Sequence, residues 1–253
     1  MSLRRVTVRT AGDAAEPLRA RLLELVPDGF EERDNGGVVE LAAYVSEREV
    51  EAILAAFPGA TAEAVEDGWE DAWRTFHRPV VVQGLWLGPP WERPPDPSRT
   101  VVIDPGRAFG TGAHPTTRLC VDLLARTTRR GSLLDVGCGS GVLAIAAVRL
   151  GFEPVLAVDV DPVAVETTRT NAEANGVSVR AMVVDALAET LPAARVAVAN
   201  VLLGPVERIL ARLDSVEAIT SGYLAGERPA HPGWSHVETL ELDGWAADRF
   251  RRP

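Results

Sequence analysis

The sequence predicts an α/β protein with a doubly wound, mostly parallel sheet, preceded by a small ferredoxin-like α+β domain. Two patterns carry this prediction. Residues 3–65 follow the order strand, helix, strand, strand, helix, strand, which describes a ferredoxin-like unit. From about residue 99 onward, short apolar runs alternate with helical stretches, which is typical of a parallel sheet whose strands are connected by helices.

The front elements follow from local patterns. Residues 3–9 alternate apolar and polar side chains, which is the period of a strand. The turn at 34–37 contains an Asn-Gly pair, a strong hairpin signal. Ser46 followed by Glu49 forms a capping-box pattern at the start of a helix. We therefore expect strands at 3–9, 30–33, 38–43 and 60–65, with helices at 14–26 and 46–57.

The middle of the chain is predicted to connect two domains. Residues 66–78 predict a helix whose aromatic side chains share one face, an arrangement that packing explains better than a ligand site. Short apolar segments follow at 80–82 and 85–87, and the proline-rich stretch 88–97 fits a loop or linker. The expected division is a front domain at 1–65, a linker helix and loop at 66–98, and a second domain at 99–253.

The second domain has the pattern of a doubly wound sheet. Its continuous apolar runs have the length and flanks of buried parallel strands. These strands are expected at 133–136, 155–158, 181–184 and 195–199, and the helices between them at 142–150, 162–175 and 203–213. Ligands of such sheets bind beyond the carboxyl ends of the strands, so the residues that follow each run are the candidates for a site.

Composition excludes several classes of protein. Two cysteines and four scattered histidines do not suggest a disulfide scaffold or a metal cluster. No apolar stretch reaches the ~20 residues of a membrane span, and the N-terminus lacks the apolar segment of a secretory signal, so we expect a cytoplasmic protein. The net charge of −10 disfavours nucleic-acid binding. It suits a basic protein partner, although solubility alone also explains it.

A glycine-rich turn after the first of these strands is the strongest chemical signal. Gly137, Gly139 and Gly141 allow close approach of a ligand to the backbone at a helix N-terminus. The next residue is Val142, where the dinucleotide fingerprint has glycine or alanine. This difference favours S-adenosylmethionine over NAD, although a purely structural turn would also explain the glycines.

Two acids end the next two strands. Asp159 lies about twenty residues beyond the glycines, where a carboxylate can accept hydrogen bonds from both ribose hydroxyls. Its neighbour Asp161 is expected to cap the following helix. Asp185 ends the third strand and is expected either to receive an adenine amino group or to cap a short helix.

Asn200 ends the fourth strand and is the candidate catalytic residue. Its amide oxygen can accept a hydrogen bond from an amine and aim the nitrogen lone pair at a sulfonium methyl group, whereas a turn-forming amide is the simpler reading. A lysine amine has a pKa of ~10.4, so neutralising it near pH 7 costs ~4–5 kcal/mol, and burial beside a cation lowers this cost. Upstream, the pliable loop at 104–119 can fold over a cofactor, with Phe109 excluding water and a threonine hydroxyl meeting the methionine part, or it can be a mere connection. His114 has no acid partner in the sequence, and we do not expect it to act as a base.

The segments DPGRAFGTGAHPTT, LLDVGCGSGVLAIAA, AVDVDPVAV, NAEANGV and VANVLLGPV together resemble the bacterial methyltransferase family that modifies ribosomal protein L11. The resemblance covers residues 66–225 closely and the front domain only loosely. It implies a class I methyltransferase-like fold, a substrate-recognition domain at 1–65 and an S-adenosylmethionine-binding catalytic domain at 99–253. It also implies methylation of lysine side chains and an N-terminal amine of a basic ribosomal protein. We expect a monomer that binds neither nucleic acid directly nor a membrane.

The resemblance implies cofactor contact by four residues, namely Thr116, Gly137, Asp159 and Asn200. The expected cofactor-binding residues are Phe109, Thr116, Gly137, Gly139, Asp159, Asp185 and Asn200, with Asn200 also catalytic and with no metal. The chain departs from the family at residues 225–234, where it is shorter, and in its polar last segment. These differences keep two alternatives open: a methyltransferase for another protein or a small molecule, and a cofactor-binding module without turnover.

Overall fold

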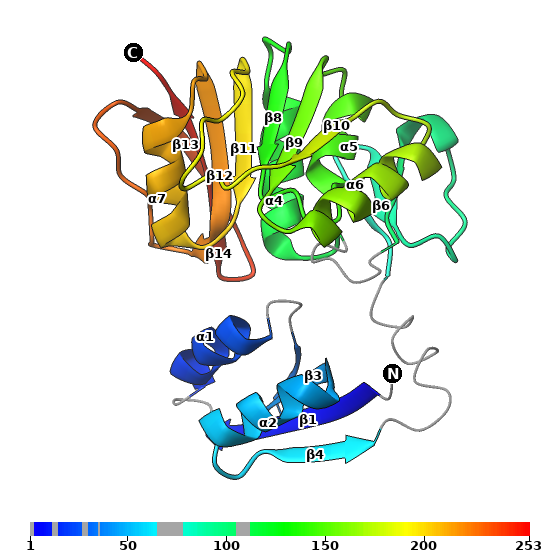
Figure 1. Ribbon diagram of the computed structural model, residues 1–253, viewed down its shortest axis with the longest axis vertical. Helices are drawn as coiled ribbons and strands as arrows, with labels where there is room; N and C mark the ends of the chain where they lie inside the picture. Colours follow the sequence, from blue (N-terminus) through cyan, green and yellow to red (C-terminus); the bar gives the residue numbers. More distant parts are fainter. Residues whose placement is uncertain (1–2, 12–14, 27–29, 35, 65–77, 105–111) are drawn as a thin grey trace. The chain divides into compact units, whose positions relative to one another are not determined.

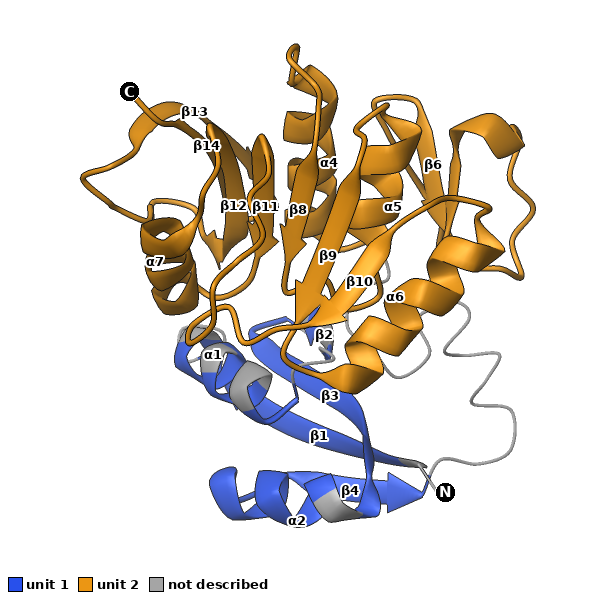
Figure 2. Ribbon diagram, turned by 45° about the horizontal axis from the view of Figure 1, so that its top comes forward, with its two compact units in different colours: residues 1–76 blue, residues 77–253 orange. Residues whose placement is uncertain are grey.

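The computed structural model describes residues 3–11, 15–26, 30–34, 36–64, 78–104 and 112–253 (Figure 1). The chain forms two compact units, residues 1–76 and 77–253 (Figure 2), and each is described by itself. The domain roles and the boundaries at residues 65 and 98 stay a prediction. None of the helices in the described ranges combines the length and hydrophobicity that a bilayer crossing demands.

The first unit has the predicted order of elements. These are β1 (Leu3–Ala11), α1 (Ala15–Leu25), β2 (Glu31–Asp34), β3 (Val38–Ser46), α2 (Glu47–Ala56) and β4 (Thr61–Ala64). The sheet has the order β2-β3-β1-β4, and its pairs are antiparallel. The Glu49 carboxylate accepts the Ser46 backbone N–H at 2.7 Å, which confirms the predicted cap of α2. The helix predicted at 66–78 lies, apart from its last residue, outside the described residues.

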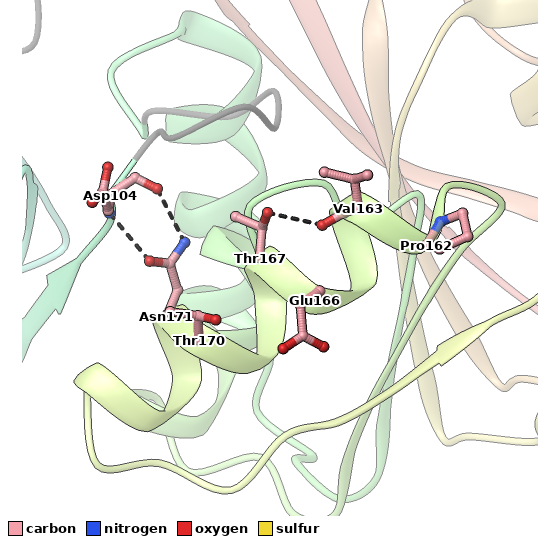
Figure 3. Close-up of a pocket in the computed structure, with 7 residues that line it drawn as sticks. All are labelled: Asp104, Pro162, Val163, Glu166, Thr167, Thr170 and Asn171. Atoms are coloured by element: carbon pink, nitrogen blue, oxygen red, sulfur yellow. Dashed lines mark hydrogen bonds between the residues drawn. The ribbon is translucent and has the colours of Figure 1, made fainter.

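The second unit begins with a small three-stranded sheet. It consists of β5 (Val80–Val82), β6 (Leu85–Gly88) and β7 (Thr100–Val102), which lie in that order. Side-chain amides of α6 (Pro162–Ala174) and of the residue capping it bind the chain at β7. Asn175 accepts the Val102 N–H at 2.8 Å and donates to the Val102 carbonyl at 2.6 Å. Asn171 forms the same pair of bonds with Asp104, at 3.2 and 3.3 Å (Figure 3). The two amides therefore substitute for a neighbouring strand.

The main sheet has seven strands and is mostly parallel. Its strands are β8 (Leu133–Val136), β9 (Val155–Asp159), β10 (Arg180–Val183), β11 (Val196–Asn200), β12 (Glu217–Leu224), β13 (Ser235–Leu242) and β14 (Trp245–Arg251). The order is β10-β9-β8-β11-β12-β14-β13; β14 pairs with both β12 and β13 in antiparallel fashion, and the other pairs are parallel. The predicted strands β8 to β11 are confirmed to within one residue at each end. The last three strands are not among those predicted.

Helices cover both faces of this sheet (Figures 1 and 2). One core packs α4 (Pro115–Arg126), α5 (Val142–Arg149) and α6 against the sheet, and a second core packs α7 (Leu203–Arg212) against the other face. The chain leaves β8 toward β9 and β10, then returns to place β11 on the other side of β8. This reversal is the point at which doubly wound sheets bind ligands.

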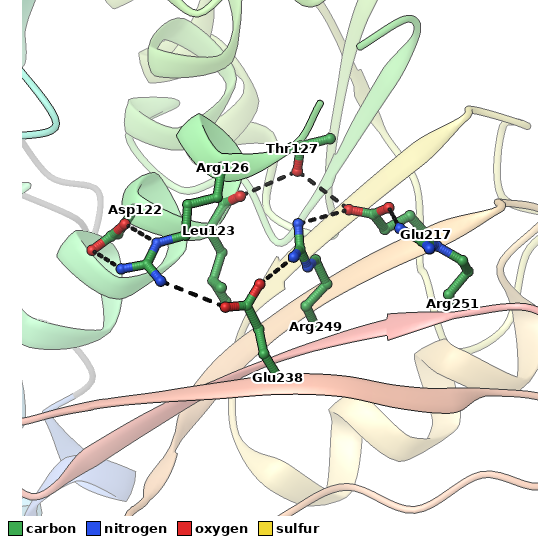
Figure 4. A network of polar contacts seen from close by, with 8 residues as sticks. All are labelled: Asp122, Leu123, Arg126, Thr127, Glu217, Glu238, Arg249 and Arg251. Atoms are coloured by element: carbon green, nitrogen blue, oxygen red, sulfur yellow. Dashed lines mark hydrogen bonds and ion pairs between the residues drawn. The ribbon is translucent and has the colours of Figure 1, made fainter. Parts of the chain in front are cut away.

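An ion-pair network that is buried at Glu217 and exposed at Arg126 and Arg251 joins α4 to the last strands (Figure 4). Glu217 is 7% exposed, and its carboxylate accepts the Thr127 hydroxyl at 3.2 Å and pairs with Arg249 at 3.6 Å and Arg251 at 3.2 Å. Glu238 pairs with Arg249 and, at 3.5 Å, with Arg126 of α4. Because each buried charge has an opposite charge beside it, strands with polar side chains can lie inside the fold. This explains why the polar last segment is a strand.

Candidate active site

Four predicted site residues follow adjacent strands and meet at one edge of the sheet. Asp185, Asp159, Gly137 and Asn200 lie at or just beyond the carboxyl ends of β10, β9, β8 and β11, which are neighbours in this order. The strands are parallel, so their carboxyl ends share one edge. Asp185 is the farthest from Asn200 in this series.

The glycine turn between β8 and α5 is tightly packed against neighbouring side chains. Gly137, Gly139 and Gly141 have φ values of +75°, +52° and +82°, which side chains rarely adopt. A Cβ atom at Gly137 would lie 2.7 Å from Val201, and one at Gly141 would lie 2.8 Å from Thr168. The backbone N–H groups of residues 137 and 138 both donate to the Val158 carbonyl, at 2.8 and 3.1 Å. Only glycine therefore fits at both ends of this turn.

Asp159 is held in place by two backbone donors. One carboxylate oxygen accepts the Gly139 N–H at 3.0 Å, and the other accepts the Asp161 N–H at 3.0 Å. An ionised carboxylate has about four lone-pair positions, so both oxygens can accept further bonds. Asp161 in turn accepts the Val163 N–H at 2.8 Å, which confirms it as the cap of α6.

Asp185 makes local contacts. Its carboxylate accepts the Leu187 N–H at 2.8 Å, and its own N–H donates to Glu189 at 2.9 Å. These bonds close a turn at residues 186–189, where the structure has no helix for Asp185 to cap. A contact with adenine stays a prediction.

A chain of hydrogen bonds connects Asn200 to the start of α4. The Asn200 Nδ2 donates to the Thr116 hydroxyl at 3.1 Å, and that hydroxyl lies 2.7 Å from His114 Nδ1. The Thr116 backbone N–H also points at His114 Nδ1, at 3.4 Å, so this nitrogen is an acceptor. The hydroxyl proton must then be donated to His114, and the Thr116 oxygen accepts from Asn200. This polarity places the amide NH₂ of Asn200 toward Thr116 and leaves Oδ1 as the group available to a ligand.

His114 is neutral in this arrangement. Burial lowers the pKa of His114 to about 4, and its ring packs edge-on against Trp245 with centroids 5.0 Å apart. A neutral imidazole whose acceptor nitrogen is occupied fixes the position of Thr116 but is not a free base. The sequence reading excluded His114 as a base and missed its role in capping α4. The signal was its position directly before the Pro-Thr-Thr of a helix start.

Phe109 lies outside the described residues, and its predicted contact with a cofactor stays a prediction. A cavity of about 440 Å³ lies beside α6, lined by Asp104, Pro162, Val163, Glu166, Thr167, Thr170 and Asn171 (Figure 3). None of the described residues predicted to hold the cofactor lines this cavity. The candidate site is therefore the edge of the sheet from Asp159 to Asn200.

Asp135 is a buried acid that the sequence reading did not single out. It lies in β8, two residues before Gly137, and is 1% exposed. One oxygen accepts the Ala144 N–H at 3.0 Å, and the other has no hydrogen-bond partner among the described residues. Burial, reinforced by the charge of Asp159, raises the pKa of the Asp135 carboxyl from 3.8 to about 7. The strand that leads into the glycine turn therefore contains a carboxyl group that resists ionisation.

Comparison with known proteins relates this arrangement to one family. The family model described as ribosomal protein L11 methyltransferase matches residues 28–252. A ribosomal protein L11 methyltransferase from Yersinia pseudotuberculosis is 47% identical over 169 residues, which are 64% of this chain and 57% of that protein. One from Dechloromonas aromatica is 41% identical over 190 residues, covering 74% and 63%.

A solved structure of a ribosomal protein L11 methylase is also similar to this chain. The crystal structure of a ribosomal protein L11 methylase from Lactobacillus delbrueckii subsp. bulgaricus superposes with a TM-score of 0.61 at 27% identity, covering 70% of this chain and 98% of that one. The matches to the two curated relatives span less than two thirds of each relative's length.

Proposed function

This chain belongs to the ribosomal protein L11 methyltransferase family, and we propose that it transfers methyl groups from S-adenosylmethionine to amines of a ribosomal protein. The acceptors are lysine side chains or an N-terminal amine. The hydrogen-bonded chain from His114 through Thr116 to Asn200, beside the glycine turn, is the observation that carries this proposal. The cytoplasmic location and the monomeric state belong to the same proposal.

The described residues fit an adenosyl cofactor. At Gly137 and Gly141 the space of a Cβ atom is taken by Val201 and Thr168, so only glycine can form this turn, which leads into the N-terminus of α5, where backbone N–H groups can meet a ligand. Asp159 is oriented by Gly139 and retains lone pairs for ribose hydroxyls. When bound, the cofactor supplies an electrophilic methyl group on a sulfonium ion. Thr116 lies beside Asn200, with its hydroxyl 3.1 Å from the Asn200 amide, and we infer that it contacts the methionine part of the cofactor.

Asn200 has the geometry to aim an acceptor amine. Its Oδ1 can accept an N–H from the amine, which directs the nitrogen lone pair away from the amide and toward the carbon that it attacks. The amine must arrive deprotonated, and burial next to a cation favours that form. His114 is neutral and already accepts from Thr116, so the proposed mechanism needs alignment more than it needs a protein base.

The charge distribution supports a basic protein as the substrate. Residues 1–76 hold 16 of the 36 acidic residues but only 8 of the 26 basic residues, and therefore −8 of the net charge of −10. A strongly acidic unit attracts a basic partner over long range. We therefore propose the front unit as the region that receives the ribosomal protein.

The test is transfer of labelled methyl groups. The purified chain is incubated with labelled S-adenosylmethionine and unmethylated ribosomal protein L11, and the label is located by mass spectrometry. All 26 basic residues of this chain are arginines, so its own side chains offer no lysine amine as a competing acceptor. Label in a different protein or in a small molecule would replace the proposed substrate. Tight cofactor binding without transfer to any acceptor would indicate a module without turnover.

Asp159→Ala is expected to weaken binding of S-adenosylhomocysteine by about 1–3 kcal/mol, because hydrogen bonds to a charged group are lost. Isothermal titration calorimetry measures this change. Asp161→Ala is the matched control, since it removes the cap of α6 but no predicted ribose contact. Equal affinities of the Asp159→Ala variant and the wild type would contradict the role of Asp159.

Asn200→Ala is expected to lower kcat by about tenfold to a hundredfold, a larger effect than on the affinity for S-adenosylhomocysteine. The reason is that misalignment of reacting atoms costs rate rather than ground-state binding. Steady-state kinetics with the protein acceptor measures kcat, and calorimetry measures the affinity. A variant with unchanged kcat would remove Asn200 from the catalytic role.

A further inference from the structure

One buried side chain connects two segments that flank the candidate cofactor site. Asn171 of α6 is 3% exposed. Its Nδ2 donates to the Ser140 carbonyl at 2.9 Å, inside the glycine turn, and to the Asp104 carbonyl at 3.3 Å. Its Oδ1 accepts the Asp104 N–H at 3.2 Å. The amide thus binds the glycine turn and the segment after β7 at the same time. Figure 3 shows its two bonds to Asp104.

The same helix holds the glycine turn at a second point. The Thr168 hydroxyl donates to the Gly139 carbonyl at 3.0 Å, and the Thr168 side chain occupies the space that a Cβ atom of residue 141 would need. Two successive carbonyl groups of the turn, at residues 139 and 140, therefore accept bonds from α6. This helix follows directly after Asp159 and Asp161, so a single rigid element fixes both the turn and the acid.

Asn175 offers an internal comparison. It lies one helical turn after Asn171 and forms the equivalent pair of bonds with Val102. Its third bond goes to the Asn171 carbonyl of its own helix, at 2.7 Å, and not to the glycine turn. Both asparagines attach β7 to α6, but only Asn171 also reaches the turn.

We propose that Asn171 is a positioning residue of the cofactor site, which sets the glycine turn against Asp104, two residues after β7. This inference rests on the proposed function, because the turn is assigned to S-adenosylmethionine there. A buried amide with every polar atom bonded holds one geometry, since water has little access to replace a lost bond. The turn therefore has its ligand-binding shape before the cofactor arrives, and preorganisation of this kind raises affinity.

The test compares Asn171→Ala with Asn175→Ala. Each variant loses a pair of backbone bonds, Asn175 to Val102 of β7 and Asn171 to Asp104 just after it, so thermal unfolding is expected to show similar decreases in Tm. Calorimetry with S-adenosylhomocysteine is expected to show a Kd raised about tenfold or more for Asn171→Ala and a nearly unchanged Kd for Asn175→Ala. Asn171→Asp keeps the acceptor for the Asp104 N–H but loses the donor to Ser140, and its Kd is expected to rise as well.

Hydrogen exchange on the wild type adds a measurement that needs no variant. Binding of S-adenosylhomocysteine is expected to slow amide exchange at residues 102–104 together with residues 137–141, because Asn171 couples them. Equal Kd values for wild type and Asn171→Asp, or equal Kd increases in the two alanine variants, would overturn the positioning role while leaving the proposed function intact. If the wild type binds neither S-adenosylmethionine nor S-adenosylhomocysteine, the proposed function fails, and this inference fails with it.

Discussion

Gly222→Ala is expected to lower the free energy of unfolding by about 3–5 kcal/mol, the sum of backbone strain and overpacking. Gly222 has a φ of +104° and lies in β12 at a break in its pairing with β14. A Cβ atom here would lie 2.6 Å from the carbonyl carbon of Val201 and 3.0 Å from its nitrogen. Both contacts are with backbone, so no side-chain rotation relieves them.

The same substitution is expected to reduce turnover. Val201 directly follows Asn200, and Asn200 pairs with Ser221, the neighbour of Gly222. Any movement that relieves the clash therefore displaces the residue proposed to aim the amine, and a shift of about 1 Å can cost a hundredfold in rate.

Gly226→Ala separates strain from collision. Gly226 has a φ of +90°, but a Cβ atom there would meet nothing within 4 Å. Urea denaturation of both variants should show a loss of only about 1–2 kcal/mol for Gly226→Ala. If Gly222→Ala is no less stable than Gly226→Ala, the packing of Gly222 on Val201 does not constrain the site.

The sequence predicts most of the fold because its signals are local. Strands β8 to β11 are short and mostly apolar runs, and their ends in the structure differ from the predicted ends by at most one residue. Strands β12 to β14 lack this signal. Glu217 and Asp248 are buried in them, and each is stabilised by partners distant in the sequence, such as Arg249 and Tyr223. No short window of sequence contains both members of these pairs.

The same distinction applies to the candidate site. Strand ends in a parallel sheet meet at one edge, so periodicity predicts that Gly137, Asp159 and Asn200 lie along the same edge, and the strand order confirms this. Their roles rest on their chemistry and on the family resemblance, and stay predictions. The contact between Thr116 and Asn200 spans 84 residues, and the bonds of Asn171 to Asp104 span 67. Such contacts depend on how α4 and α6 pack, which periodicity does not determine.

Asp135→Asn is expected to make the protein more stable near pH 7.5 and to remove part of its pH dependence. The Asp135 pKa is about 7 in the folded chain against an ordinary value of 3.8. Below about pH 3 the carboxyl is neutral in both the folded and the unfolded state, so it has no effect there. Between pH 4 and 7 the unfolded chain releases this proton while the folded chain keeps it, so stability falls as pH rises.

The size of this effect follows from the shift. About three pKa units at 1.36 kcal/mol each give a loss of about 4 kcal/mol, complete above about pH 7. An asparagine has nearly the same shape, does not titrate, and can still accept the Ala144 N–H that Asp135 accepts. The stability difference between variant and wild type should therefore grow by about 4 kcal/mol, in favour of the variant, from pH 4 to pH 7.5.

Urea denaturation of both proteins at several pH values across this range measures the difference, and carboxyl groups common to both cancel. A difference that stays constant with pH would show that Asp135 ionises freely in the folded chain. A growing difference would mean that the chain retains a destabilising acid directly beneath its glycine turn. Destabilising residues are tolerated where function requires them. The affinity of the Asp135→Asn variant for S-adenosylhomocysteine, measured at the same pH values, would show whether the carboxyl also contributes to cofactor binding or only lowers the stability of the fold.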